Sequence, residues 1–124
     1  MKIQQSQENY LETIYVLKKK NGFVRSVDVA NELDYSKASV SVAMKSLREA
    51  GYVTVDTDGG ISLTELGLDV AQSMNERHEV IANVLISLGV SAETAYEDSC
   101  KIEHVLSEET FLKIKEYLEK IREN

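Results

Sequence analysis

The sequence predicts a mainly α-helical fold. Its 124 residues include no proline and only 6 glycines, so few positions interrupt a helix. Hydrophobic residues make up 43% of the chain, enough for the core of one domain or of a small domain with a helical extension. No apolar run approaches the roughly 18 residues that span a bilayer, and the start MKIQQSQENY lacks a signal-peptide core. We therefore expect a cytoplasmic protein without a membrane partner.

The charge and the cysteine content exclude several kinds of site and function. A single cysteine excludes an internal disulfide and a structural zinc site made of several cysteines, and it fits a reducing compartment. The formal net charge of −7 argues against a protein that coats nucleic acid by bulk charge. The stretch 18–48 is nevertheless net positive, by 7 basic minus 3 acidic residues. Its basic residues are Lys18, Lys19, Lys20, Arg25, Lys37, Lys45 and Arg48.

The first 63 residues have the pattern of a winged helix-turn-helix. A helix is expected over 7–20, with Asn9 and Glu12 opposite its apolar residues, which are Tyr10, Leu11, Ile14, Val16 and Leu17. After an extended piece over 23–25, Ser26 is expected to cap a helix over 27–33, and a turn over 34–36 leads to a helix over 37–50. Strands over 52–55 and 61–63 flank turn-forming residues. A hairpin in this place predicts a wing.

The second helix of a helix-turn-helix enters the major groove through its N-terminal residues. Here these residues are small or hydroxylated, so they can approach phosphates, base edges and thymine methyl groups closely. The candidate DNA-binding residues are Arg25, Ser36, Lys37, Ala38, Ser39, Ser41, Val42 and Lys45. A helical hairpin with a polar outer face is the alternative, and the wing carries Asp56 and Asp58 but no cation, which weakens the DNA interpretation.

Residues 64–124 are expected to form an all-helical domain. Thr64 should cap a helix over 65–88, Ser91 should open a helix that contains Cys100, Glu103 and His104, and Ser107 should open the last helix. Apolar stripes on the first and last of these helices exceed the needs of one core; they comprise Leu66, Val70, Met74, Ile81, Val84, Leu85 and Leu88, and Phe111, Ile114, Leu118 and Ile121. Such stripes point to a homodimer, whose symmetry would present two recognition helices to a palindromic DNA site.

A second pattern predicts a metal site. Cys100, Glu103 and His104 stand at i, i+3 and i+4, which places a thiol, a carboxylate and an imidazole on one face of a helix. These groups bind ions such as Fe(II), Mn(II), Co(II), Ni(II) or Zn(II). The candidate ligands are Asn9, Glu12, His78, Cys100, Glu103 and His104. Because they come from three predicted helices, an ion bound there would bias the positions of those helices and could control DNA binding. A buried thiol, a hydrogen-bonded histidine and solvated carboxylates are the alternative.

Several motifs resemble a known family. They are YLETIY at 10–15, VANEL at 29–33 with SVS at 39–41, LTELG at 63–67, RHE at 77–79 and EHVLS at 103–107. In these motifs the chain resembles the metal-dependent repressors typified by the diphtheria toxin repressor and the manganese transport regulator, in the short form without an SH3-like domain. The resemblance implies a homodimeric winged-helix repressor that binds operator DNA when loaded with Fe(II) or Mn(II) and controls genes of metal homeostasis.

Carried over position by position, the resemblance implies the same six ligands. Four of them keep the manganese type, namely Glu12, His78, Glu103 and His104. Cys100 is the iron-type residue, and Asn9 matches neither type and is a weaker donor. Ala82 and Tyr96 replace the glutamate and histidine of an ancillary site. The thiol favours Fe(II) over Mn(II), and also Co(II), Ni(II) or Zn(II) in vitro.

We therefore expect a metal-activated repressor that prefers Fe(II), with Mn(II) next. Its DNA-binding domain should cover 1–63, and its metal-binding and dimerisation domain 64–124. The alternative is a metal-independent winged-helix regulator that responds to a small ligand or a protein partner. An enzyme with Cys100 as nucleophile and His104 as base is not expected, because such i, i+4 partners lie side by side on one helix and no oxyanion donors are evident.

Overall fold

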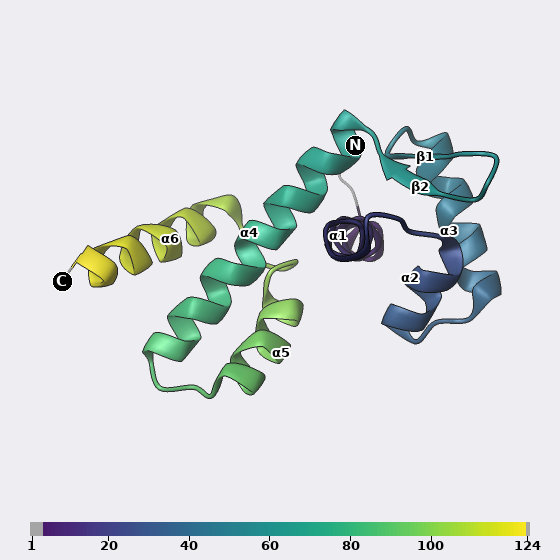
Figure 1. The fold of residues 1–124 in the computed structure, drawn as a ribbon. Coiled ribbons are helices and arrows are strands. Elements are labelled where there is room, and N and C mark those ends of the chain that lie inside the picture. Colours follow the sequence, from purple (N-terminus) through teal and green to yellow (C-terminus); the bar gives the residue numbers. More distant parts are fainter. Residues whose placement is uncertain (1–3, 124) are drawn as a thin grey trace. The chain divides into compact units, whose positions relative to one another are not determined.

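The computed structural model describes residues 4–123 (Figure 1). In chain order its elements are α1 (Gln5–Asn21), α2 (Ser26–Leu33), α3 (Lys37–Glu49), β1 (Val53–Val55), β2 (Ile61–Leu63), α4 (Glu65–Ser87), α5 (Ala92–Ile102) and α6 (Glu108–Glu123). They confirm the expected class, a winged helix-turn-helix followed by helices. The chain forms two compact units, Met1–Gln72 and Ser73–Asn124. The outer ends of the predicted domains, residues 1–3 and 124, lie outside the described residues.

The first unit packs α1, α2, α3 and the β-hairpin around one apolar core. Its fully buried side chains include Leu11 and Ile14 of α1, Val29 of α2, Val40 and Leu47 of α3, Val53 of β1 and Ile61 of β2. The turn between α2 and α3 is tight because Asp34 adopts a left-handed conformation, with φ 58°. Ser36 then caps α3, since its hydroxyl oxygen accepts the Ser39 N–H at 3.1 Å. These two residues set the geometry of the helix-turn-helix.

The wing is a short antiparallel hairpin in which Val53 lies opposite Leu63. The extended residues before α2 join it, because the Ile61 N–H donates to the Val24 carbonyl at 2.8 Å. At the tip, one carboxylate oxygen of Asp56 accepts the N–H groups of Asp58 and Gly60, at 2.9 Å and 2.8 Å. Asp56 therefore holds the shape of the turn.

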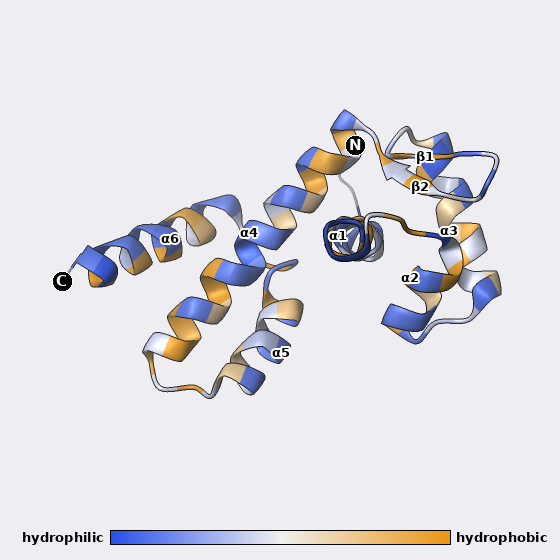
Figure 2. Cartoon of the chain, viewed as in Figure 1, coloured by the Kyte–Doolittle hydropathy of each residue, from blue (hydrophilic) through white to orange (hydrophobic). Residues whose placement is uncertain are grey.

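The second unit consists of the C-terminal part of α4 together with α5 and α6. Ser91 and Ser107 cap the last two helices, as expected, by accepting the N–H groups of Thr94 and Thr110. Hydrophobic and hydrophilic residues alternate along α4 and α6 (Figure 2). The buried apolar side chains are Met74, Ile81, Ala82, Ala95, Phe111 and Leu118. Within residues 4–123, none of the helices combines the length and the apolar character needed to cross a membrane.

Two expectations about single residues need correction. Val16 was expected on the apolar side of α1 but is 43% exposed, because two residues past Ile14 correspond to about 200° of rotation. Helix α2 begins at Ser26 itself, after Arg25, whose N–H donates to the Asp28 carboxylate at 2.9 Å.

We predict that Gly67→Ala destabilises the protein, although alanine favours helices. Gly67 lies in the first turn of α4, and a Cβ atom there would clash with the Tyr52 carbonyl oxygen. The backbone clash should outweigh the roughly 1 kcal/mol gain in helix propensity, for a net loss of about 1–3 kcal/mol. Urea unfolding followed by circular dichroism measures the free energy. Gln72→Ala, at an exposed position of the same helix, is the control. A Gly67→Ala variant as stable as the parent would contradict the close approach.

Candidate metal centre

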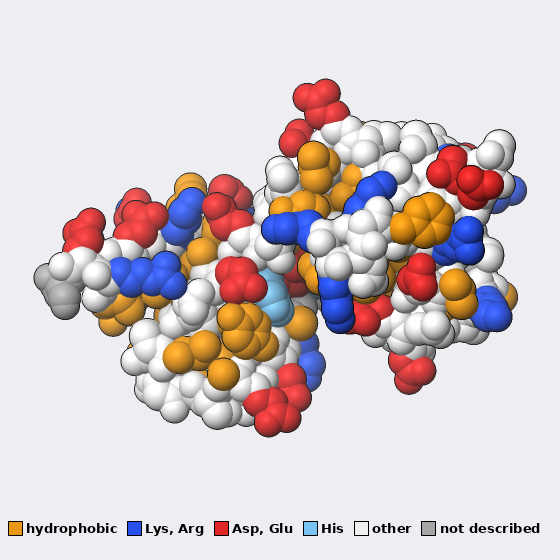
Figure 3. All heavy atoms as spheres, viewed as in Figure 1, with side chains coloured by type: hydrophobic (Ala, Val, Ile, Leu, Met, Phe, Trp, Pro, Cys, Tyr) orange, Lys and Arg blue, Asp and Glu red, His pale blue; other side chains and the backbone are white. Residues whose placement is uncertain are grey.

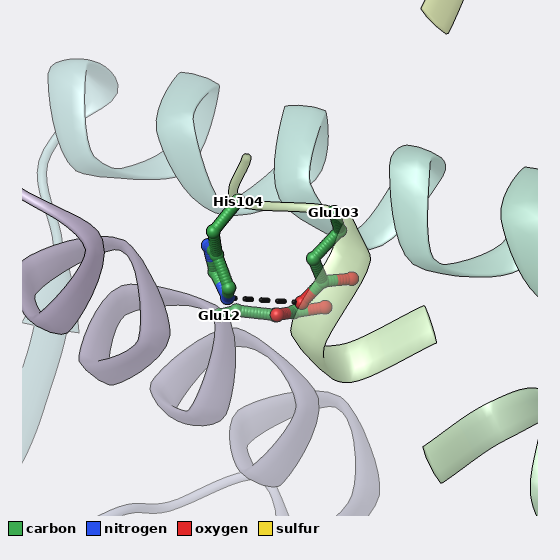
Figure 4. Close-up of side chains that lie close together, drawn as sticks. All are labelled: Glu12, Glu103 and His104. Carbon is green, nitrogen blue, oxygen red and sulfur yellow. Dashed lines mark ion pairs between the residues drawn. The ribbon is translucent and has the colours of Figure 1, made fainter. Parts of the chain in front are cut away.

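Two imidazole rings face one carboxylate in the second unit. Glu103 directly follows α5, and its Oε2 lies 3.1 Å from Nδ1 of His78 on α4. Its Oε1 lies 3.2 Å from Nε2 of His104, and Figure 4 shows these two side chains turned toward each other. Glu103 is 1% exposed. A buried carboxylate is costly unless polar or charged groups compensate it, and the two rings do so here.

The thiol of Cys100 joins this cluster from the last turn of α5. Its Sγ lies 3.8 Å from His78 Nδ1, the same nitrogen that faces Glu103. Cys100 is exposed. The cluster therefore offers one sulfur, two imidazole nitrogens and a carboxylate, a donor set that fits a divalent transition ion of intermediate softness. His78, Cys100, Glu103 and His104 are the residues of the second unit that would hold it.

The path of the chain after Cys100 differs from the prediction. Helix α5 ends at Ile102, and although Glu103 still has helical angles, with φ −56° and ψ −30°, His104 lies in the following turn. The expectation of one helix face for all three residues is therefore wrong for His104. Arg77 of α4 binds this turn, because its Nη1 donates to the carbonyls of Glu103 and Leu106 at 3.1 Å and 2.7 Å. These bonds stabilise a turn in place of further helix.

Two other side chains, Ser99 and Tyr96, lie next to His78. The sequence indicates no role for Ser99, and it places Tyr96 only at a position of the ancillary site. Ser99 is fully buried, and its hydroxyl donates to the His78 carbonyl at 2.6 Å, which ties α5 to α4. The Tyr96 ring lies 5.4 Å from the His78 ring, and its hydroxyl donates to Glu79 at 3.1 Å. That hydrogen bond to a carboxylate raises the pKa of Tyr96. For Arg77, the only signal in the sequence is its position directly before the candidate ligand His78 in the motif RHE.

The remaining two candidate ligands belong to the first unit. Asn9 and Glu12 lie one turn apart on α1, and the Asn9 carbonyl accepts the Thr13 hydroxyl at 2.8 Å. The structure thus brings four of the six candidates together within the second unit. Ligation by Asn9 and Glu12 stays a prediction.

The first unit presents the candidate DNA-binding residues on its surface. All eight are exposed, and Val42 on α3 is 72% exposed. Basic, acidic and hydrophobic side chains are interspersed on the visible face of this unit (Figure 3). Some of the eight also have local contacts. Ser36 caps α3 and its hydroxyl donates to the Ser39 hydroxyl at 2.9 Å, and the Arg25 guanidinium lies 5.0 Å from the centre of the Phe23 ring.

Comparison with known protein families matches both parts of the chain. Residues 2–61 match "Iron dependent repressor, N-terminal DNA binding domain", and residues 64–124 match "Iron dependent repressor, metal binding and dimerisation domain". An uncharacterized HTH-type transcriptional regulator of Methanocaldococcus jannaschii is 36% identical over 121 residues, 96% of this chain and 97% of the relative. The transcriptional regulator MntR of Escherichia coli O157:H7 is 38% identical over 103 residues, 83% of this chain and 66% of the relative.

Solved structures agree with this fold. The manganese regulator SloR superposes with a TM-score of 0.80 at 26% identity, over 91% of this chain and 53% of that one. The IdeR protein of T. acidophilum has the same fold over 94% of this chain and 55% of that one, with a TM-score of 0.81 at 23% identity. The chain thus spans about half the length of these two proteins. Members of the matched family are transcriptional repressors and not enzymes, which confirms the expectation of a non-enzymatic function. The chain belongs to the iron-dependent repressor family of metal-dependent transcriptional regulators.

Proposed function

We propose that the protein is a cytoplasmic, homodimeric repressor that binds palindromic operator DNA when loaded with a divalent transition metal and controls genes of metal-ion homeostasis. The cluster of His78, Cys100, Glu103 and His104 carries this proposal, because it lies in the region that matches a metal-binding and dimerisation domain. A bound ion would supply the positive charge that holds a thiolate, a carboxylate and neutral imidazoles together.

The resemblance to metal-dependent repressors supports two further assignments. Asn9 and Glu12 would add an amide and a carboxylate to the ligands of the second unit. The functional division would fall between residues 63 and 64, with the DNA-binding domain before it and the metal-binding and dimerisation domain after it. The exposed apolar residues of the second domain, such as Leu88 and Tyr117, are compatible with a dimer interface.

Fe(II) is the proposed activating metal, with Mn(II) second. Cys100 is the reason, since thiolate is a softer ligand than carboxylate and Mn(II) prefers oxygen donors. SloR is described as a manganese regulator, whereas MntR is described only as a transcriptional regulator. We therefore propose that the residue at position 100 determines which metal this chain prefers.

We predict that Cys100→Glu shifts metal preference toward Mn(II). Replacing the thiol by a carboxylate removes the soft donor and keeps a negatively charged ligand on α5. The ratio of Fe(II) to Mn(II) affinity should fall by a factor on the order of 10 or more. Anaerobic calorimetric titration of each ion into the purified protein measures both affinities.

The matched control is Ala92→Glu, which adds a carboxylate at the exposed start of the same helix, away from the cluster. It should leave the ratio of affinities as in the parent protein. If Cys100→Glu also left the ratio unchanged, Cys100 would not be a ligand. If neither Fe(II) nor Mn(II) bound the parent protein, the proposed metal-dependent function would fail.

For DNA, we propose that α3 enters the major groove and that Arg25, Lys37 and Lys45 contact phosphates. The exposure of these residues and of Ala38, Ser39, Ser41 and Val42 supports the proposal, as does the match of residues 2–61 to a DNA-binding domain. Ser36 would contribute mainly by fixing the start of α3, because its hydroxyl already accepts a backbone N–H.

We predict that Lys37→Ala weakens DNA binding and leaves metal binding intact. In the proposed homodimer the substitution removes one phosphate contact from each protomer, so the slope of log K against log[salt] should fall in magnitude by about 2. Fluorescence anisotropy measures it with a duplex selected from a random pool on the Fe(II)-loaded protein. Lys113→Ala, at an exposed position of α6, is the control. An unchanged slope in Lys37→Ala would place Lys37 away from the DNA.

The same assay separates the proposal from its alternative. Addition of a metal chelator should abolish binding to the selected duplex, and Fe(II) in excess of the chelator should restore it. Binding that persists in chelator would instead indicate a metal-independent winged-helix regulator.

A further inference from the structure

We infer that Arg77 is a positioning residue for the metal centre, which orients Glu103 and His104 by fixing the backbone of the turn that carries them. This inference rests on the proposed metal-binding function. Arg77 lies on α4 immediately before His78 and is 8% exposed. Its side chain is therefore buried within the second unit, and it is not itself a candidate metal ligand.

The guanidinium group of Arg77 is bonded in several directions at once. Its Nη1 donates to the Glu103 carbonyl at 3.1 Å and to the Leu106 carbonyl at 2.7 Å. Its Nη2 donates to the carboxylate of Glu108, in the first turn of α6, at 3.0 Å. The ring of Phe111 lies 5.1 Å from its central carbon. Three segments, the end of α5, the turn and the start of α6, are thus held by one side chain.

The two carbonyl acceptors lie on either side of His104 in the chain. Since the last carbonyls of a helix have no partner within it, the bond to Glu103 replaces one that a longer helix would have made. The bond to Leu106 sets where the turn closes. Together they determine the direction in which the chain leaves α5, and with it the position of the His104 ring.

Glu103 is held at both ends by neighbouring residues of α4. Arg77 binds its backbone carbonyl, and His78 faces its carboxylate at 3.1 Å. A shift of the backbone at Glu103 would therefore move a carboxylate that two candidate ligands contact. This links the Arg77 hydrogen bonds to ligand geometry, beyond a general contribution to folding.

A lysine could not replace these contacts. Arginine presents several N–H donors in a rigid planar fork, whereas lysine is a point charge on a flexible chain. The carbonyl bonds and the ion pair can also be separated. Glu108 is 70% exposed at its side chain, and exposed ion pairs contribute little. We therefore assign the positioning role to the two carbonyl bonds.

The test compares Co(II) binding by the parent protein, Arg77→Lys, Arg77→Met and Glu108→Gln, with Lys115→Met as the control that removes another ion pair of the same unit. Co(II) is the probe because its visible spectrum reports coordination geometry. Arg77→Met and Arg77→Lys should weaken binding about 10- to 100-fold, as loss of a ligand-orienting group does. Their spectra should differ from the parent's in band position and intensity. Glu108→Gln and Lys115→Met should bind within about twofold of the parent.

Circular dichroism at the titration temperature establishes that each variant is folded. Arg77→Lys keeps the charge and most of the volume, so it decides the matter if Arg77→Met does not fold. Parent-like Co(II) affinity and spectrum in folded Arg77→Lys, even with a lower melting temperature, would overturn the inference and leave Arg77 a structural residue. Absence of Co(II) binding by the parent protein would instead contradict the proposed function.

Discussion

The burial of one carboxylate constrains how the second unit can pack. Glu103 is 1% exposed, and an ionised group in that position is tolerated only where nearby groups compensate its charge. Two imidazole nitrogens face its two oxygens at 3.1 Å and 3.2 Å, and the buried Arg77 binds its carbonyl. A divalent cation would compensate the same charge more strongly. Folding of this unit and metal binding therefore use the same residues, and the end of α5 serves both.

In the first unit, polar residues shape the surface that would meet DNA. Asp34 in its left-handed conformation and Ser36 as a cap set the angle between α2 and α3, and so expose the N-terminal turn of α3. Asp56 at the wing tip is occupied by two backbone N–H groups. The side-chain oxygen of Asp56 therefore has a role in the turn, which gives this residue a structural reason to stand in the wing.

The fold class followed from the sequence because its signals are local. Serine caps, glycines after helices and the hairpin pattern lie within a few residues of the elements they define, as with Ser91 and Ser107. The path of the chain at His104 could not be predicted from the sequence. The i, i+3, i+4 spacing indicates a continuing helix, whereas the turn is bound by Arg77, which is distant in sequence. Arg77 and Ser99 act on backbone carbonyls of another helix, and such contacts leave no periodic trace in the sequence. The residue types predicted a cluster of His78 with Cys100, Glu103 and His104. Its geometry could not be predicted, because it depends on how α4 packs against α5.

Iron X-ray absorption on the anaerobic Fe(II)-loaded protein tests the central claim most directly, with Cys100→Ser as the comparison. Ligation by Cys100 and the histidines predicts a sulfur scatterer and imidazole multiple scattering around iron in the parent protein, and loss of the sulfur alone in Cys100→Ser. A first shell of oxygen and nitrogen only, identical in both proteins, would contradict the assignment of Cys100 as the ligand that sets the metal.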